Sequence, residues 1–255
     1  MACASAEQEP ITHDDRTGPL LVATGVRKIY KNPAGDVEVL RGIDVEIHSG
    51  ELVMVMGPSG NGKTTLLNCL SGLDSIDAGT VFVDGVDIHR INDRRRTRLR
   101  AKRMGFVFQS FNLIPVFTAL ENTELPLLCI GMGPRPARAA AEHALERLGI
   151  ADKMHRRPLE LSGGEQQRVA IARSLVTDPH IIWADEPTGS LDHHTAGEVL
   201  GVLHEVHESG QTLVIVTHDR AIGTSGERLI QVVDGAINFD GPPEDVPPEP
   251  DPLAE

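Results

Sequence analysis

The sequence predicts an α/β fold in which a mostly parallel sheet forms the core and a helical segment is inserted near the middle of the chain. Three short apolar runs, at 52–56, 181–184 and 213–216, predict buried strands. The runs lack alternation between polar and apolar residues, which is typical of parallel strands covered on both faces. Each run is followed by glycine, polar or acidic residues, where open α/β sheets bind their ligands.

The inserted segment is expected to be helical. Residues 134–148 start with a proline, which is favoured in the first helical turn, and Gly149 ends this helix. A second helix is expected at the end of residues 161–175. Apolar residues recur along one side of each helix, which predicts that this side packs on the core. They are Ala137, Ala141, Ala144, Leu145 and Leu148 in the first helix and Val169, Ala172 and Val176 in the second.

Composition and charge exclude several classes of protein. The chain has 255 residues, 40% of them hydrophobic and 24% charged, which is typical of a globular protein. A net charge of -13 argues against binding nucleic acid through overall charge. We find no apolar stretch that approaches the roughly 18 to 20 residues needed to cross a bilayer, and no signal peptide. Another protein must therefore hold this one at a membrane if it works there.

The chain is expected to contain one domain, at 19–240, between two flexible ends. Residues 1–18 are small and polar and predict a flexible leader, and residues 241–255 predict a Pro-rich, acidic, disordered tail. The helical subdomain is expected at about 110–170, and no motif occurs twice. Three widely spaced cysteines fit reduced thiols better than a disulfide framework or a zinc site. They are Cys3, Cys69 and Cys129.

A glycine-rich segment directly after the first apolar run matches the pattern GxxxxGK[ST]. Its glycines allow consecutive backbone N–H groups to surround phosphate oxygens at the start of a helix. Lys63 is expected to reach the β- and γ-phosphates, and the Thr64 hydroxyl to bind Mg²⁺. The alternative is a glycine-rich turn with an incidental lysine. The predicted nucleotide-binding residues of this segment are Gly57, Pro58, Ser59, Gly60, Asn61, Gly62, Lys63, Thr64 and Thr65.

Two acids, Asp185 and Glu186, follow the strand predicted at 181–184. On its own such a pair is a common feature of a helix N-terminus. Combined with an upstream phosphate loop, Asp185 is expected to hold Mg²⁺ and Glu186 to polarise the attacking water of phosphoryl transfer. The pair therefore supplies a metal ligand and a catalytic residue.

The segment from Leu161 to Gln167 reads LSGGEQQ and forms a second potential anion-binding helix start. Ser162 and Glu165 have the spacing of a capping box, which alone is a structural device. Together with the phosphate loop, the string resembles the signature of ATP-binding cassette ATPases. This resemblance implies a P-loop NTPase (RecA-like) core, an N-terminal antiparallel β region and the inserted helical subdomain. It also implies that Ser162, Gly163 and Gly164 close over ATP held by a second copy of the chain.

The remaining motifs of that family occur in the expected order over about 20–240. Gln109 resembles the glutamine that senses Mg²⁺ and the membrane partner, and Asp192 lies in a segment that resembles the D-loop of the dimer interface. His218 resembles the switch histidine at the γ-phosphate, although a lone histidine after a strand is usually structural. Tyr30, the only tyrosine, resembles the aromatic residue that stacks on adenine.

Within the family, residues 105–115, 118–122, 125–127 and 184–189 resemble the macrolide-export, lipoprotein-release and FtsE branch (MacB-like). That resemblance implies an ATPase that works as a homodimer with ATP and Mg²⁺, bound to an FtsX-like permease. It also implies a cytoplasmic location, peripheral on the inner face of the plasma (inner) membrane. Asn61 departs from the small residue usual in the family, but asparagine tolerates tight turns.

Two other classes of protein share a phosphate loop. A soluble cassette ATPase acting on nucleic acid or ribosomes normally carries two cassettes or a long coiled-coil insertion, and a P-loop kinase or small GTPase would lack the signature. Residues 94–103 contain seven Lys or Arg. This run predicts either a solvated helix face or a contact with anionic lipid or an acidic partner loop.

Overall fold

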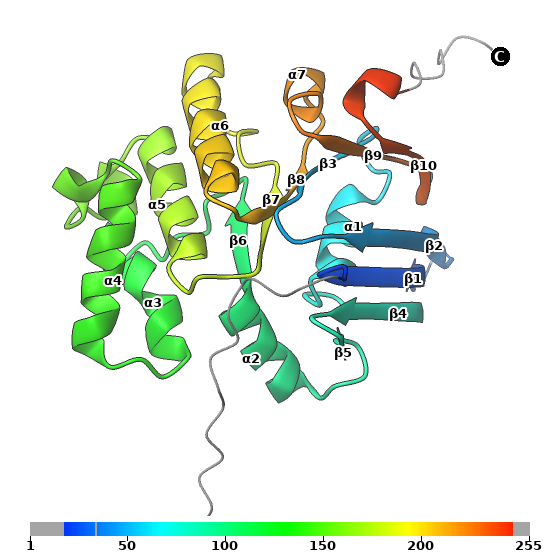
Figure 1. The fold of residues 1–255 in the computed structure, drawn as a ribbon, viewed down its shortest axis with the longest axis horizontal. Helices are drawn as coiled ribbons and strands as arrows, with labels where there is room; N and C mark the ends of the chain where they lie inside the picture. The colour runs from blue at the N-terminus through cyan, green and yellow to red at the C-terminus, as the bar shows by residue number, and fades with distance from the viewer. Residues whose placement is uncertain (1–17, 34, 247–255) are drawn as a thin grey trace, which may run out of the picture.

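The computed structural model describes residues 18–33 and 35–246. A six-stranded sheet lies at the centre of the molecule (Figure 1). Its strand order is β10-β9-β3-β8-β7-β6. The five strands from β9 to β6 are parallel, and β10 pairs antiparallel with β9 at the edge. The strands are β3 Leu52–Met56, β6 Met104–Phe108, β7 Ile181–Asp185, β8 Thr212–Val216, β9 Arg228–Val233 and β10 Ala236–Gly241. The predicted α/β class with a mostly parallel sheet is confirmed.

Both faces of this sheet are covered, as the uniform apolar runs predict. In β3, Val53 and Val55 pack in a core cluster that includes the apolar residues of helix α1, Lys63–Leu70. The neighbouring Leu52 and Met54 pack on the opposite side, in a cluster with residues of helix α6, His193–Glu208. Trp183 of β7 has no exposed side-chain surface.

A second sheet, of four antiparallel strands, lies beside the central sheet (Figure 1). Its order is β2-β1-β4-β5, and α1 packs between the two sheets. The strands are β1 Leu21–Tyr30, β2 Val37–Ile47, β4 Ala78–Val83 and β5 Val86–Asp87. This sheet confirms the expected N-terminal antiparallel β region.

Three helices form a subdomain at the far side of the molecule from the antiparallel sheet (Figure 1). They are α3 Ala119–Cys129, α4 Pro134–Arg147 and α5 Gly163–Leu175, with short 3₁₀ turns η1 Ala151–Lys153 and η2 Pro158–Glu160 between the last two. In α4 the predicted inner face is buried at Ala137, Ala141 and Leu145, whereas Ala144 is only partly buried. Helix α5 ends at Leu175, as expected for the helix predicted at the end of 161–175, and so runs five residues past 170, the approximate limit expected for the helical subdomain.

The basic run forms helix α2, Asp93–Arg103, in which no residue is buried. Short α7, Arg220–Gly223, precedes β9. After β10 the chain forms a 3₁₀ turn, η3 Pro243–Asp245, with Pro243 buried. Regular structure thus extends past the predicted start of the tail at Gly241. The predicted leader, except Gly18, and residues 247–255 of the tail lie outside the described residues. No helix of the described chain is long and apolar enough to span a membrane.

Strand order determines where the chemistry is located. Strands β3, β8, β7 and β6 are parallel neighbours, so their carboxyl ends meet at one edge of the sheet. The four segments that leave this edge contain the phosphate loop, His218, the two acids and Gln109, respectively. Four motifs far apart in the sequence are therefore brought together by topology.

Candidate active site

The phosphate loop joins β3 to α1 and has a backbone that only glycine accommodates at its first position. Gly57 has φ 148°, and a Cβ there would lie 1.9 Å from the carbonyl oxygen of Val232 in the adjacent strand. Gly62, the N-cap of α1, has φ 94°. These glycines let the loop approach β9 and turn into the helix, leaving the N–H groups of its first turn available.

Lys63, the first residue of α1, folds back over the loop. Its Nζ donates to the carbonyl oxygen of Gly57 at 2.8 Å and to that of Pro58 at 3.0 Å, and only 8% of the residue is exposed. Burial lowers the pKa of Lys63, while the negative charges of Glu186 and Asp185 oppose that shift. A cation that is bound only to carbonyls, with acids close by, is well placed to bind phosphate oxygens.

Thr64 and Asp185 bring two oxygen donors together beside this lysine. The Thr64 hydroxyl donates to Asp185 Oδ1 at 3.0 Å. Burial raises the pKa of Asp185, and the hydrogen bond from Thr64 partly offsets the rise. Among residues 18–33 and 35–246, no group of three or more His, Cys, Asp or Glu side chains is placed to hold a metal ion. A hydroxyl and one carboxylate instead fit Mg²⁺, which is usually bound by one or two protein oxygens together with substrate phosphates.

Glu186 directly follows β7 and contacts the predicted switch histidine. His218 Nδ1 lies 2.8 Å from Glu186 Oε1, and the Glu186 backbone N–H donates to the carbonyl oxygen of Val216 at 2.9 Å. Glu186 has φ 49°, a left-handed conformation that non-glycine residues adopt rarely and often at functional sites. The His218 side chain is 65% exposed and that of Glu186 is 18% exposed. The carboxylate is therefore largely buried, while the histidine that contacts it is accessible to solvent.

Gln109 lies next to the two acids because Phe108 of β6 pairs in register with Asp185 of β7. Its side chain packs so closely on Gly189 that a Cβ there would lie 2.9 Å from the Gln109 Nε2 atom. The Ser190 hydroxyl donates to the Gln109 carbonyl oxygen at 2.8 Å. The predicted Q-loop residue and the segment before Asp192 are thus in direct contact.

The LSGGEQQ segment has the expected capping box at the start of α5. The Ser162 N–H donates to Glu165 Oε2 at 2.8 Å, and the Glu165 N–H donates to the Ser162 hydroxyl at 3.4 Å. Gly164 is packed tightly, since a Cβ would lie 2.4 Å from Thr195 Cγ2, and a Cβ on Gly163 would lie 2.9 Å from a methyl carbon of Leu191. The two glycines therefore let α5 pack against the segment that starts α6.

Asp192 is the N-cap of α6. Its carboxylate accepts from the Thr195 N–H at 3.1 Å and from the Thr195 hydroxyl at 2.6 Å. No hydrogen bond or ion pair among the described residues joins Asp192 or 162–164 to the phosphate loop. Within one chain these predicted residues form a second cluster, apart from Lys63 and Asp185.

Tyr30 lies at the end of β1 with 38% of its surface exposed. Its hydroxyl donates to Asp74 Oδ2 at 2.8 Å; burial raises the pKa of Tyr30, and hydrogen bonding by the Thr65 side chain of α1 opposes the rise. An exposed ring next to the first turn of α1 is placed as a base-stacking residue would be. Sequence reasoning missed Asp74, for which no local pattern gives a signal.

Asn61 makes a contact that sequence reasoning also missed. Its Oδ1 accepts from the Asp234 N–H at 2.6 Å, and its Nδ2 donates to the Ser59 carbonyl oxygen at 3.3 Å. Asp234 has φ 48° in the turn between β9 and β10. Asparagine at this position therefore links the phosphate loop to a neighbouring turn, which serine or alanine is too short to do in the same way.

Comparison with known families matches residues 40–189 to the family described as ABC transporter. An uncharacterized ABC transporter ATP-binding protein of Thermotoga maritima is 47% identical over 212 residues, which are 83% of this chain and 91% of that protein. The lipoprotein-releasing system ATP-binding protein LolD 2 of Caulobacter vibrioides is 43% identical, covering 87% of this chain and 97% of its own. The macrolide export ATP-binding/permease protein MacB 1 of Aeromonas hydrophila is 44% identical, but this chain spans only 36% of it.

Among solved structures, the chain is similar to the ATP-binding cassette MJ0796 in a dimeric post-hydrolysis state bound to ADP and Pi. The TM-score is 0.80 at 39% identity, and the match covers 87% of this chain and 98% of that one. A second dimeric structure of MJ0796, a bacterial ABC transporter cassette, gives a TM-score of 0.80 at 40% identity. Fold and sequence thus agree on the same class of protein.

Proposed function

The chain belongs to the ABC transporter family, and from that premise we propose a mechanism for it. It is the ATP-binding subunit of such a transporter: it binds and hydrolyses ATP, dimerises as a cassette and works with a membrane permease. No relative named above supports the alternative of a soluble cassette acting on nucleic acid or ribosomes. The single observation that carries the mechanism is the convergence of Lys63, Asp185 and Glu186 at one sheet edge.

The phosphate loop of this chain binds the triphosphate, and Lys63 exchanges its carbonyl partners for the β- and γ-phosphate oxygens. Thr64 and Asp185 would hold Mg²⁺, and Gln109, which follows the strand paired with that of Asp185, would be a further ligand. The ion, when bound, neutralises charge on the β- and γ-oxygens and so supports transfer to water.

Hydrolysis itself needs a positioned water. Glu186 accepts a hydrogen bond from that water, whose oxygen attacks the γ-phosphorus as the bond between that phosphorus and the β,γ-bridging oxygen breaks. The products are ADP and inorganic phosphate, and a proton of the water leaves through the carboxylate. His218, 2.8 Å from Glu186, orients this carboxylate and reaches toward the γ-phosphate.

The second cluster acts on the nucleotide of the other subunit. Ser162, Gly163 and Gly164 begin an α-helix, so their N–H groups and the helix dipole attract anionic oxygen. The separation of this cluster from the phosphate loop of the same chain and the dimeric state of similar cassettes support this assignment. Asp192 and Ser190 then lie at the interface between copies.

We infer that the permease is FtsX-like and that the ATPase is peripheral on the inner face of the plasma membrane. Support comes from similarity to both lipoprotein-release and macrolide-export proteins, the latter joining an ATP-binding part and a permease in one chain. Two measurements test the proposal. Phosphate release by the purified protein should require Mg²⁺ and stop with a chelator, and the protein that co-purifies from detergent-solubilised membranes should be an FtsX-like permease. Metal-independent hydrolysis, or a permease of another class, would contradict the corresponding part.

A further inference from the structure

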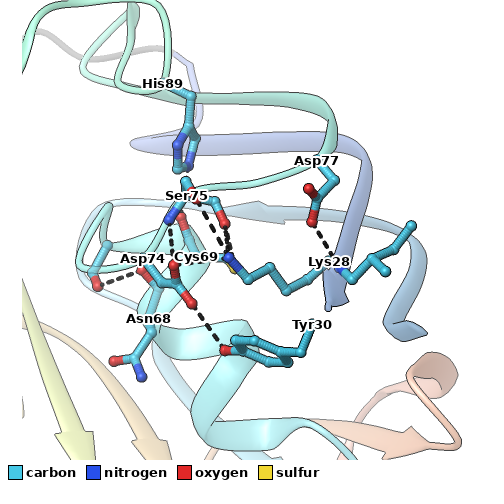
Figure 2. A network of polar contacts seen from close by, with 10 residues as sticks. Lys28, Tyr30, Asn68, Cys69, Asp74, Ser75, Asp77 and His89 are labelled. Carbon is cyan, nitrogen blue, oxygen red and sulfur yellow. Dashed lines mark hydrogen bonds and ion pairs between the residues drawn. The ribbon is translucent and has the colours of Figure 1, made fainter. Parts of the chain in front are cut away.

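A network of polar groups joins Lys28 and Tyr30 of β1 to Asp74 and Ser75, which follow α1 in the chain (Figure 2). At its centre is the carboxylate of Asp74. Oδ2 of Asp74 accepts from the Tyr30 hydroxyl at 2.8 Å, and Oδ1 accepts from Lys28 Nζ at 2.8 Å and from the Ser75 N–H at 2.7 Å. One carboxylate thus joins an aromatic ring, an ammonium group and a turn of the backbone.

Lys28 is unusual because it is charged and only 6% exposed. Its Nζ donates to the carbonyl oxygen of Ser75 at 2.7 Å and lies 5.0 Å from the centre of the Tyr30 ring. Burial lowers the pKa of Lys28, but the hydrogen bond to Asp74 and the negative charge of Asp74 raise it by more. The pKa of Lys28 is therefore raised. A buried ammonium is costly unless it is paired, which indicates that this pair is a built feature and not a surface ion pair.

The network also ties Tyr30 to the helix that carries the phosphate-binding residues. Lys28 and Tyr30 are two residues apart on β1, so they share one face of the strand. Asp74 and Ser75 lie in the turn that follows α1, whose first residue is Lys63. The hydrogen bond from the Tyr30 hydroxyl to Asp74 therefore ties the ring to the segment that carries the phosphate-binding residues.

We propose that Lys28 and Asp74 are positioning residues that fix the Tyr30 ring for stacking on the nucleotide base. The proposal rests on the proposed role of Tyr30 in base stacking. A ring already fixed loses little rotational freedom when the base binds, whereas a free ring must be ordered at that moment. If the ring must be ordered when the base binds, the cost in free energy weakens base binding about two- to tenfold.

The first test compares ATP with inorganic tripolyphosphate, which has the phosphates but no base. Asp74→Ala should weaken ATP binding about two- to tenfold and leave tripolyphosphate binding unchanged. Tyr30→Phe, which keeps the ring and the Lys28–Asp74 pair, should show the same selective loss. The double variant should lose no more than either single variant, because both remove one contact. Equal losses for ATP and tripolyphosphate would overturn the proposal.

Asp77→Ala is the matched control, since Asp77 Oδ2 accepts only the Ile29 N–H at 2.7 Å and does not contact the ring. It should leave both affinities unchanged. A selective loss of ATP binding in this variant would also overturn the assignment. It would show that any disturbance of β1 weakens ATP binding, without a specific role for the contacts of Tyr30.

The second test is spectroscopic. Tyr30 is the only tyrosine, so tyrosinate absorbance in the ultraviolet reports its ionisation alone. Burial and the hydrogen bond to Asp74 raise the pKa of Tyr30. Asp74→Ala should therefore lower it, and Asp77→Ala should not. An unchanged Tyr30 titration in Asp74→Ala would show that the contact does not hold the hydroxyl.

Tyr30→Leu separates the two levels of the argument. If it fails to weaken ATP relative to tripolyphosphate, base stacking by Tyr30 is wrong and the proposed function needs another base contact. If it does weaken ATP selectively while Asp74→Ala and Tyr30→Phe do not, stacking stands and the positioning role of Lys28 and Asp74 is overturned.

Discussion

The Thr64 hydroxyl lies 3.0 Å from Asp185 Oδ1, although 121 residues separate the two in the chain. Thr64 is the second residue of α1, which follows β3, and Asp185 ends β7, with β8 between the two strands. The Thr64 hydroxyl and the Asp185 carboxylate are joined by a hydrogen bond. In the same positions, both oxygens could instead bind one hard cation. This pair is therefore the feature of the site that most directly indicates Mg²⁺.

The first prediction concerns that cation. Asp185→Asn and Thr64→Ala should each reduce the Mg²⁺ dependence of ATP binding, with at least about a tenfold loss of Mg²⁺-ATP affinity for Asp185→Asn, because a carboxylate ligand is lost. Calorimetric titration with ATP, with and without Mg²⁺, measures it. Asp77→Ala, a substitution outside the phosphate loop and away from both acids, serves as the control. If Mg²⁺ increased the ATP affinity of Asp185→Asn as much as that of the wild type, the ion would be held by other residues.

Lys63→Met tests the cation of the phosphate loop. The variant keeps an unbranched side chain, one atom shorter, but removes the charge that we assign to the phosphate oxygens. ATP should raise the melting temperature of the wild type and leave that of the variant unchanged, since stabilisation by a ligand follows its concentration relative to its dissociation constant. An equal ATP-induced shift in both proteins would contradict the assignment.

Asn61 is expected to act on stability more than on binding. Asn61→Ala removes the acceptor of the Asp234 N–H, a contact of 2.6 Å. We expect a loss of about 1 kcal/mol in the free energy of unfolding, typical of one hydrogen bond, and a change in ATP affinity of less than about threefold. Urea unfolding measures the first and calorimetry the second. A stability equal to wild type would mean that the contact contributes nothing.

The Asp74 carboxylate predicts a pH dependence of stability. Burial tends to raise its pKa, but the hydrogen bonds from Lys28, Tyr30 and Ser75 outweigh this, and the pKa is lowered below the ordinary value of 3.8. The folded state thus favours the ionised form, so the stabilisation is complete above the unfolded pKa and is lost as the pH falls through the folded pKa. Wild type should be more stable than Asp74→Asn at neutral pH, and the difference should shrink below about pH 4. Urea unfolding at a series of pH values tests this, and a constant difference would contradict it.

The core of the fold could be predicted because it depends on local patterns. Uniform apolar runs at β3, β7 and β8 indicate strands covered on both faces, and Pro134 with Gly149 delimits α4. The family resemblance from the LSGGEQQ segment is confirmed by the match at 40–189. The helix expected at the end of 161–175 does end at Leu175, whereas the turn at Pro243–Asp245 was missed because no periodicity marks so short an element.

The individual contacts of the site could not be predicted, since they join residues distant in the chain. Asn61 and Asp234 are 173 positions apart, and Asp74 reaches Tyr30 across 44. No spacing rule connects such pairs, because strand order and loop shape bring them together. The left-handed conformation of Glu186 is also a property of the folded chain, as glutamate has no preference for it.

The central claim is that Glu186 positions water for ATP hydrolysis between two copies of this chain, and Glu186→Gln tests it most directly. The amide keeps the size of the side chain but polarises water poorly. Phosphate release should fall on the order of 10²- to 10⁴-fold while ATP affinity stays close to wild type. Light scattering with Mg²⁺-ATP should then show an accumulated dimer, which disappears in Glu186→Gln combined with Lys63→Met. A variant that releases phosphate at the wild-type rate would contradict the account.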